Sequence, residues 1–454
     1  MRQEKNPHHN SIAHEAIPGQ TWSQSARAAF VSRVRIRTVA LGAVMMLLAL
    51  ALLGRSTPAW LEARDQRIGA IVGPWRFDLV AWEIEAIGEK LFNAASRPAA
   101  AHPVADETAL VKGYIADAQA LGNLERQINE LMAAEDATAT TAIQALQQEV
   151  DALRQEQQQR RPMVESIIQQ QVAAELAAAG FQVGRGPFPP VWFTFVEPPR
   201  KLVVSPRDRI ATVYTRMLSD AMPLTQIEID EAAIADATDL SAYITNIGGL
   251  GAYPTMVVDR ASLSWIFETV AHEWTHNYLT LFPLGLRYNE SGELITINET
   301  VAEIVGSEIG RRVVARYYPA FLPNEDTQTE RPPTEVKDAP QPFNFHREMR
   351  ETRLRVDGLL AAGFIDTAEY YMEARRQYFV AHGYSLRVLN QAYFAFHGSY
   401  GTSAASTSPL GPKLEALFQN SDSLSTFLRT VRWFTKAEDI DNALNSFTSA
   451  PKAP

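Results

Sequence analysis

Hydrophobic side chains recur at helical spacing between residues 107 and 179. Two runs have intervals of three or four positions: Leu121, Leu124, Ile128 and Leu131, then Ile143, Leu146, Val150 and Leu153. This spacing places each run on one face of a helix, and a break at 136–141 separates the runs. The pattern predicts an antiparallel helical hairpin, with a second interruption at Pro162. We expect a helical stalk domain over 55–180, which either self-associates like a coiled coil or packs on its own neighbours.

The pattern changes after residue 180, where glycine and proline become frequent. Short apolar runs typical of strands follow: 191–196, 202–204 and 255–258. The last run is either a sheet edge that pairs with an extended peptide or an ordinary internal strand. Helical patterns then dominate, except over 319–345, where proline and acidic residues predict a surface loop. The expected fold class is α+β, mostly α, with a second domain over 181–454.

One segment near the N-terminus, 38–54, carries no charged side chain. Its length is near the minimum for a transmembrane helix, about 17–25 residues. Arginines precede it, and the positive-inside bias then predicts a disordered cytoplasmic tail over 1–37 and an extracytoplasmic domain after the segment. We therefore expect a single-pass cell-membrane protein that binds the lipid bilayer through 38–54. A cleaved signal peptide and a buried soluble helix are the alternatives.

Composition excludes several classes of function. The 454 residues include 42 Lys and Arg against 52 Asp and Glu, a net charge of −10. Nucleic acid is not an expected partner, because phosphate binding needs a basic surface. The chain has no cysteine, which excludes disulfides, iron–sulfur clusters, thiol nucleophiles and Cys-ligated zinc. Any metal must be held by His, Asp and Glu.

Residues 272–276 read His-Glu-Trp-Thr-His. Histidines four positions apart lie one turn apart on the same face of a helix, so their imidazoles can converge on one ion. Apolar residues at helical spacing around them predict an amphipathic helix, which Pro283 and Gly285 end. The alternative is a partly exposed helix with two unrelated histidines.

A catalytic zinc site needs a third protein ligand and an open position for water. Glu299 follows the histidines at a distance that allows a loop and a returning antiparallel helix. Gly306 and Gly310 would let the two helices approach closely. Thr296 and Glu299 also match a capping box, in which the carboxylate binds only backbone N–H groups. The sequence leaves both roles open for Glu299.

The motif His-Glu-Trp-Thr-His at 272–276, followed by Asn298-Glu299 and by Ala302-Glu303, resembles the pattern of the gluzincin zinc metallopeptidases, the thermolysin-like and M1 aminopeptidase group. The resemblance covers residues 270–306 alone. It implies a zincin-like catalytic domain, with a small sheet over the motif helix and a helical C-terminal lobe. The Gly-Ala-Met-Glu-Asn signature of the M1 exopeptidases is absent.

The resemblance also assigns roles to residues. It implies Zn²⁺ held by His272, His276 and Glu299, with Glu273 as the general base that accepts a proton from the attacking water. Glu303 has the position of an acidic residue that hydrogen-bonds a ligand histidine and fixes its orientation.

Related enzymes stabilise the oxyanion with a tyrosine or a histidine. Three candidates are present: Tyr288 in the connecting segment, and His397 and Tyr400 around a Gly-Ser turn. We expect a membrane-anchored zinc metallopeptidase that hydrolyses peptides or proteins, as an endopeptidase or an aminopeptidase. The alternative is a non-catalytic membrane-anchored scaffold with a structural metal site, which would not need Glu273.

Overall fold

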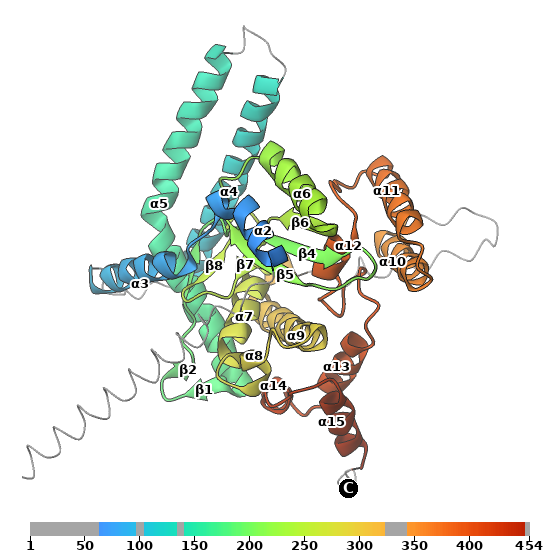
Figure 1. Cartoon of the computed structure of the whole chain (residues 1–454). Coiled ribbons are helices and arrows are strands. Elements are labelled where there is room, and N and C mark those ends of the chain that lie inside the picture. The colour runs from blue at the N-terminus through green and yellow to red at the C-terminus, as the bar shows by residue number, and fades with distance from the viewer. Residues whose placement is uncertain (1–62, 97–103, 134–139, 323–342, 450–454) are drawn as a thin grey trace, which may run out of the picture. The chain divides into compact units, whose positions relative to one another are not determined.

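The leucine-rich pattern forms a helical hairpin in the computed structural model (Figure 1). Helices α4 (Val104–Ala133) and α5 (Thr140–Leu176) run antiparallel, with Leu121 and Val150 buried between them. The interruption predicted at Pro162 is wrong, because α5 continues through it. Ile168, beyond the proline, is fully buried in the main core. This packing offsets the backbone hydrogen bond that proline removes.

The structure describes residues 63–96, 104–133, 140–322 and 343–449. Against the transmembrane helix in the predicted fold class, no helix in these ranges is long and apolar enough to cross a bilayer. Even α5, with 37 residues, is rich in charged and amide side chains. The predicted tail 1–37, the apolar segment 38–54 and most of the predicted loop 319–345 lie outside the described residues. The described chain is otherwise mostly helical with small sheets, as expected.

One antiparallel sheet has three strands, with β4 (Arg200–Pro206) between β5 (Tyr214–Leu218) and β6 (Leu240–Thr245). Leu202 and Val204 of β4 form a core with α2 (Ala63–Ile71) and α6 (Leu224–Thr238). Successive side chains of a strand alternate between faces. Lys201 and Val203 therefore lie on the opposite face, where α12 (Gln391–His397) packs on β4.

A second three-stranded sheet has the order β3-β8-β7. Strand β8 (Thr255–Val257) pairs in parallel with β3 (Phe193–Phe195) and antiparallel with β7 (Gly249–Leu250). The strand predicted over 255–258 is thus the internal one, and its interpretation as a sheet edge is wrong. The two edge strands are β3 and β7. A two-stranded ribbon, β1 (Gln182–Val183) and β2 (Gly186–Pro187), precedes this sheet in the chain.

The main core surrounds α7 (Leu263–Leu279) and α9 (Gly292–Tyr317), which pack side by side (Figure 1). The C-terminal half of α5, α13 (Leu410–Gln419) and α14 (Leu424–Val431) complete it. A smaller core lies between α10 (Phe345–Ala361) and α11 (Ile365–Ala381), with Phe394 of α12. The helical hairpin and the motif helix therefore share one core.

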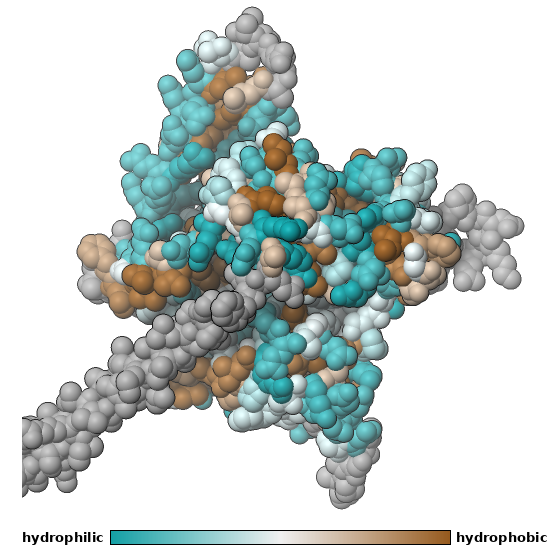
Figure 2. Space-filling view, in the orientation of Figure 1, coloured by the Kyte–Doolittle hydropathy of each residue, from teal (hydrophilic) through white to brown (hydrophobic). Residues whose placement is uncertain are grey.

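The remaining elements are short or peripheral: η1 (Gly73–Trp75), α3 (Leu79–Ser96), η3 (Ala177–Phe181), α8 (Pro283–Leu286), η4 (Pro319–Phe321) and α15 (Glu438–Ser449). Figure 2 shows hydrophobic side chains along α3, where Val80, Ile84 and Phe92 are exposed. The visible face of the α4–α5 hairpin is mainly hydrophilic.

Candidate metal centre

Helix α7 presents the two histidines. It begins after Ser262, whose side-chain oxygen accepts a hydrogen bond from a backbone N–H in the first turn, as N-cap residues do. Val270 and Trp274 are buried in the main core, in agreement with the predicted apolar face. His272 and His276 lie one turn apart and are partly buried. The helix is thus fixed on one side and presents both imidazoles on another.

Two glycines allow α9 to approach α7. A Cβ atom at Gly306 would lie 2.7 Å from the backbone oxygen of Glu268 and 3.0 Å from Cβ of His272. At Gly310 it would lie 2.9 Å from the backbone nitrogen of Glu268. A larger residue at either position would force the helices apart. The close approach predicted from this glycine pair is confirmed, and it brings Glu299 beside the imidazoles.

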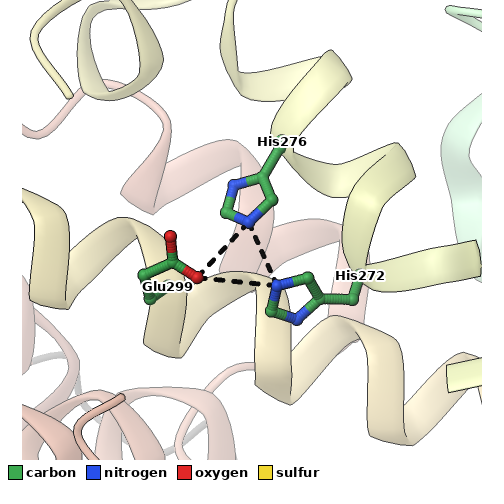
Figure 3. A group of neighbouring side chains, drawn as sticks. All are labelled: His272, His276 and Glu299. Carbon is green, nitrogen blue, oxygen red and sulfur yellow. Dashed lines mark hydrogen bonds and ion pairs between the residues drawn. The ribbon is translucent and has the colours of Figure 1, made fainter. Parts of the chain in front are cut away.

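Glu299 is not a capping residue. Helix α9 begins after Ser291, whose side-chain oxygen accepts a hydrogen bond of 3.1 Å from the backbone N–H of Leu294. Thr296 lies inside the helix, where its hydroxyl donates to a backbone carbonyl one turn earlier. The capping-box alternative is therefore wrong, because the helix starts before Thr296. Glu299 is buried and points toward the histidines (Figure 3).

The three side chains converge as one ion would require (Figure 3). Nε2 of His272 lies 3.0 Å from Nε2 of His276, and Oε2 of Glu299 lies 3.6 Å and 3.5 Å from these two nitrogens. Tetrahedral zinc with bonds of about 2.0–2.2 Å separates its ligand atoms by about 3.3–3.6 Å. Two imidazoles and one carboxylate are also a ligand set that zinc accepts. The residues therefore fit a zinc ion, and the group has three members among the described residues, which leaves a position for water.

Neighbouring polar groups orient two of these ligands. Nδ1 of His276 lies 2.7 Å from Oδ1 of Asn298. Because an amide oxygen can only accept, Nδ1 carries the proton and Nε2 keeps its lone pair for a metal. The hydroxyl of Tyr288 donates to Oε1 of Glu299, which leaves Oε2 for the ion. Asn298 thus provides the support that the resemblance assigned to Glu303.

Glu299 is ionised in this environment. Burial alone would raise the pKa of its carboxyl, but the imidazoles of His276 and His272 hold that pKa well below its usual range. Glu299 in turn raises the pKa of His276 to about 9 against the opposing effect of burial, and its negative charge would partly neutralise a divalent cation that displaced this proton. The electrostatics of the group therefore favour a cation at its centre.

Glu273 lies on α7 between the two histidines and is buried. Burial raises the pKa of its carboxyl, and the nearby imidazoles offset part of that rise. The backbone of β7 passes directly over it: a Cβ atom at Gly249 would lie 2.6 Å from Oε1 of Glu273, and one at Gly251 would lie 3.3 Å from Oε2. A side chain at Gly249 would therefore displace the carboxylate of Glu273.

The two candidate tyrosines flank the imidazoles. The ring of Tyr288 lies 6.2 Å from that of His276, and the ring of Tyr400 lies 6.4 Å from that of His272, centroid to centroid. The negative charge of Glu299, followed by burial, raises the pKa of Tyr400 well above its usual value. Burial and then Glu299 do the same for Tyr288. Both hydroxyls therefore stay protonated and can donate hydrogen bonds.

The other two predicted site residues have different neighbours. The ring of His397 lies 4.2 Å from that of Tyr393 and 6.0 Å from that of Tyr243, and burial lowers its pKa to about 4. Glu303 accepts a hydrogen bond from the hydroxyl of Thr402. Within the described residues, neither side chain hydrogen-bonds to the three candidate ligands.

Two contacts of the centre were not predicted from the sequence. Asn298 was noted only as part of a motif, although its position next to Glu299 was the signal available. The passage of the β7 edge over Glu273 was also missed, although the glycine-rich run at 248–251 was a sign of close backbone approach.

Comparisons with protein-family models, curated proteins and solved structures found no match. The likeness to gluzincins therefore rests on residues 270–306.

Proposed function

We propose that the protein is a zinc-dependent metallopeptidase that hydrolyses peptide bonds with water. One observation carries this proposal. The donor atoms of His272, His276 and Glu299 lie 3.0 to 3.6 Å apart, and a buried carboxylate, Glu273, lies beside them on the same helix. A purely structural zinc site has four protein ligands and needs no such base.

A zinc ion at this position would act as a Lewis acid and lower the pKa of its water to about 7. Glu273 then accepts a proton from the attacking water and delivers it to the leaving amine. Its pKa, raised by burial, makes it a stronger base than an exposed glutamate. Tyr400 donates a hydrogen bond to the carbonyl oxygen as negative charge develops on it, while the O–H of Tyr288 stays on Glu299.

The edge strand β7 is the surface that we assign to the peptide backbone. Among the described strands it pairs only with β8, so its other edge has backbone groups free to pair. An extended peptide added there would run past Glu273, because Gly249 and Gly251 hold the strand against that carboxylate. Strand addition of this kind binds peptides largely through main-chain hydrogen bonds.

The test compares hydrolysis of a mixed peptide library by the zinc-loaded full chain and by Glu273→Gln. The substitution should reduce the rate by about 10²–10⁴-fold, the usual contribution of a general base, while zinc content stays at one ion per chain. Glu268→Gln is the matched control, since Glu268 lies on the same helix outside the ligand group. It should keep wild-type activity.

Zinc binding without hydrolysis of any peptide by the wild type would contradict the proposal and favour a structural metal site. Equal rates for the wild type and Glu273→Gln would contradict the role of Glu273.

A further inference from the structure

A cavity of about 290 Å³ opens beside the metal centre. It lies between the β4–β5 strands, α12 and the segment that begins α9, and Lys201, Val203, Thr215, Tyr288, Phe396 and Ser399 are among its lining residues. Tyr288 connects it to the centre, because the same side chain lines the cavity and hydrogen-bonds Glu299. A substrate bound at the metal therefore has a pocket next to it.

The cavity has one sign of charge. Lys201 is its charged lining residue, and no aspartate or glutamate lines it. The ammonium of Lys201 lies 5.4 Å from the centre of the Phe396 ring and forms no ion pair with any residue that the structure describes. By contrast, the preceding Arg200 hydrogen-bonds Asn246 and the backbone oxygen of Asp220. A partly buried cation without a counter-charge favours an anionic ligand.

The hydroxyl groups of the lining suit the same ligand. Thr212 and Thr215 line the same cavity and offer O–H donors, whereas the O–H groups of Ser399 and Tyr288 already donate to the backbone oxygen of Phe396 and to Glu299. The protein as a whole carries a net charge of −10, so its overall field repels acidic peptides. Attraction of an anion must therefore come from this local arrangement.

We propose that this cavity binds a carboxylate of the peptide substrate and that Lys201 determines the resulting specificity. The inference rests on the proposed peptidase function. The carboxylate comes either from an acidic side chain close to the scissile bond or from the C-terminus of a short peptide. Both sources present the same group to the ammonium.

The experiment measures kcat/KM of the zinc-loaded full chain for matched peptide pairs. One arm compares glutamate with glutamine at each position flanking the cleaved bond. The other compares a free C-terminal carboxylate with the C-terminal amide. The readout is the ratio of acidic to neutral substrate, in which any general effect of a variant on Glu273 cancels.

Lys201→Met should lower the ratio of kcat/KM for the acidic substrate to kcat/KM for the neutral one about tenfold, as expected for loss of a charge-assisted hydrogen bond. Lys201→Glu should reverse the preference, and Lys201→Arg should keep most of it. Lys112→Met is the matched control, because Lys112 also lies over an aromatic ring, at 5.6 Å from the centre of Phe321, outside the cavity. It should leave the ratio unchanged.

If Lys201→Met changes the ratio for the glutamate and glutamine pair, the carboxylate is an acidic side chain. If it changes the ratio for the free and amidated C-terminus, the carboxylate is the C-terminus of the peptide. A wild-type ratio near one in both arms, or a ratio that Lys201→Met and Lys201→Glu leave unchanged, overturns the inference. If Glu273→Gln still abolishes hydrolysis in that case, the peptidase function stands. Absence of hydrolysis by the wild type would overturn both.

Discussion

Asn298 should control metal affinity although it does not touch the metal position. Its side chain is buried, its Oδ1 lies 2.7 Å from Nδ1 of His276, and its Nδ2 donates to the backbone oxygen of Leu284 at 3.4 Å. In Asn298→Ala the Nδ1–H of His276 loses its acceptor. The imidazole is then free to rotate or to exchange its tautomer, so Nε2 is presented to the ion for a smaller fraction of the time.

The expected magnitude follows from this contact. Loss of such an orienting partner costs about 10–100-fold in metal affinity, which corresponds to about 1.4–2.7 kcal/mol. The free energy of unfolding of the metal-free protein should fall by about 1–3 kcal/mol, since a buried donor is left unpaired.

The assay is competition for zinc with a chromophoric chelator at fixed pH. Asn298→Asp keeps an acceptor for Nδ1 and should bind zinc at least as tightly as the wild type. Asn277→Ala is the control on α7: it loses hydrogen bonds of 3.1 and 3.2 Å to Ala252 and Thr255 but no contact with a candidate ligand. It should destabilise the fold without changing zinc affinity.

A zinc affinity of Asn298→Ala within about twofold of the wild type, well short of the expected loss, would show that Asn298 does not orient His276. An Asn298→Asp variant as weak as Asn298→Ala would show the same, because the acceptor would then be irrelevant.

Three further outcomes can be measured by urea denaturation. Gly306→Ala should destabilise by about 1–3 kcal/mol through overpacking, because its Cβ would meet His272 at 3.0 Å. Gly358 lies inside α10 with open space around it, so Gly358→Ala should instead raise the free energy of unfolding by about 0.5–1 kcal/mol. Equal effects of the two substitutions would contradict the close approach of α7 and α9. Glu369 has a pKa lowered chiefly by its hydrogen bond from Arg207. The stability that this pair adds is therefore fully present above the ordinary pKa of 4.5 and is lost as the pH falls through the lowered pKa of Glu369. Glu369→Gln should reduce the free energy of unfolding by about 1 kcal/mol or less at pH 7 and by progressively less below pH 4.5. A reduction that does not depend on pH would contradict this role of the Arg207–Glu369 pair.

The candidate ligands could be predicted from the sequence because their placement depends on helical periodicity. His272 and His276 share a helix face by spacing alone, and the glycine pair at 306 and 310 signalled a close neighbour. The capping role considered for Glu299 is wrong because the N-cap of the helix, Ser291, lies more than one turn before Thr296. Both positions fit a cap locally, and only the packing of the whole helix distinguishes them.

Features set by contacts between distant segments were not predicted. The order β3-β8-β7 decides which two strands are the edges, and this order depends on pairings between residues around 193, 249 and 255. The cavity around Lys201 likewise combines β4, β5 and α12. Pro162 shows the converse, since a strong local signal was overridden by the packing of the residues that follow it.

A crystal structure of the zinc-loaded protein, with anomalous diffraction measured at the zinc absorption edge, would show whether His272, His276 and Glu299 bind one ion. We expect a single strong peak within about 2.0–2.2 Å of Nε2 of His272, Nε2 of His276 and Oε2 of Glu299. A peak elsewhere, or Glu299 turned away from a zinc ion held by the two imidazoles, would contradict this expectation.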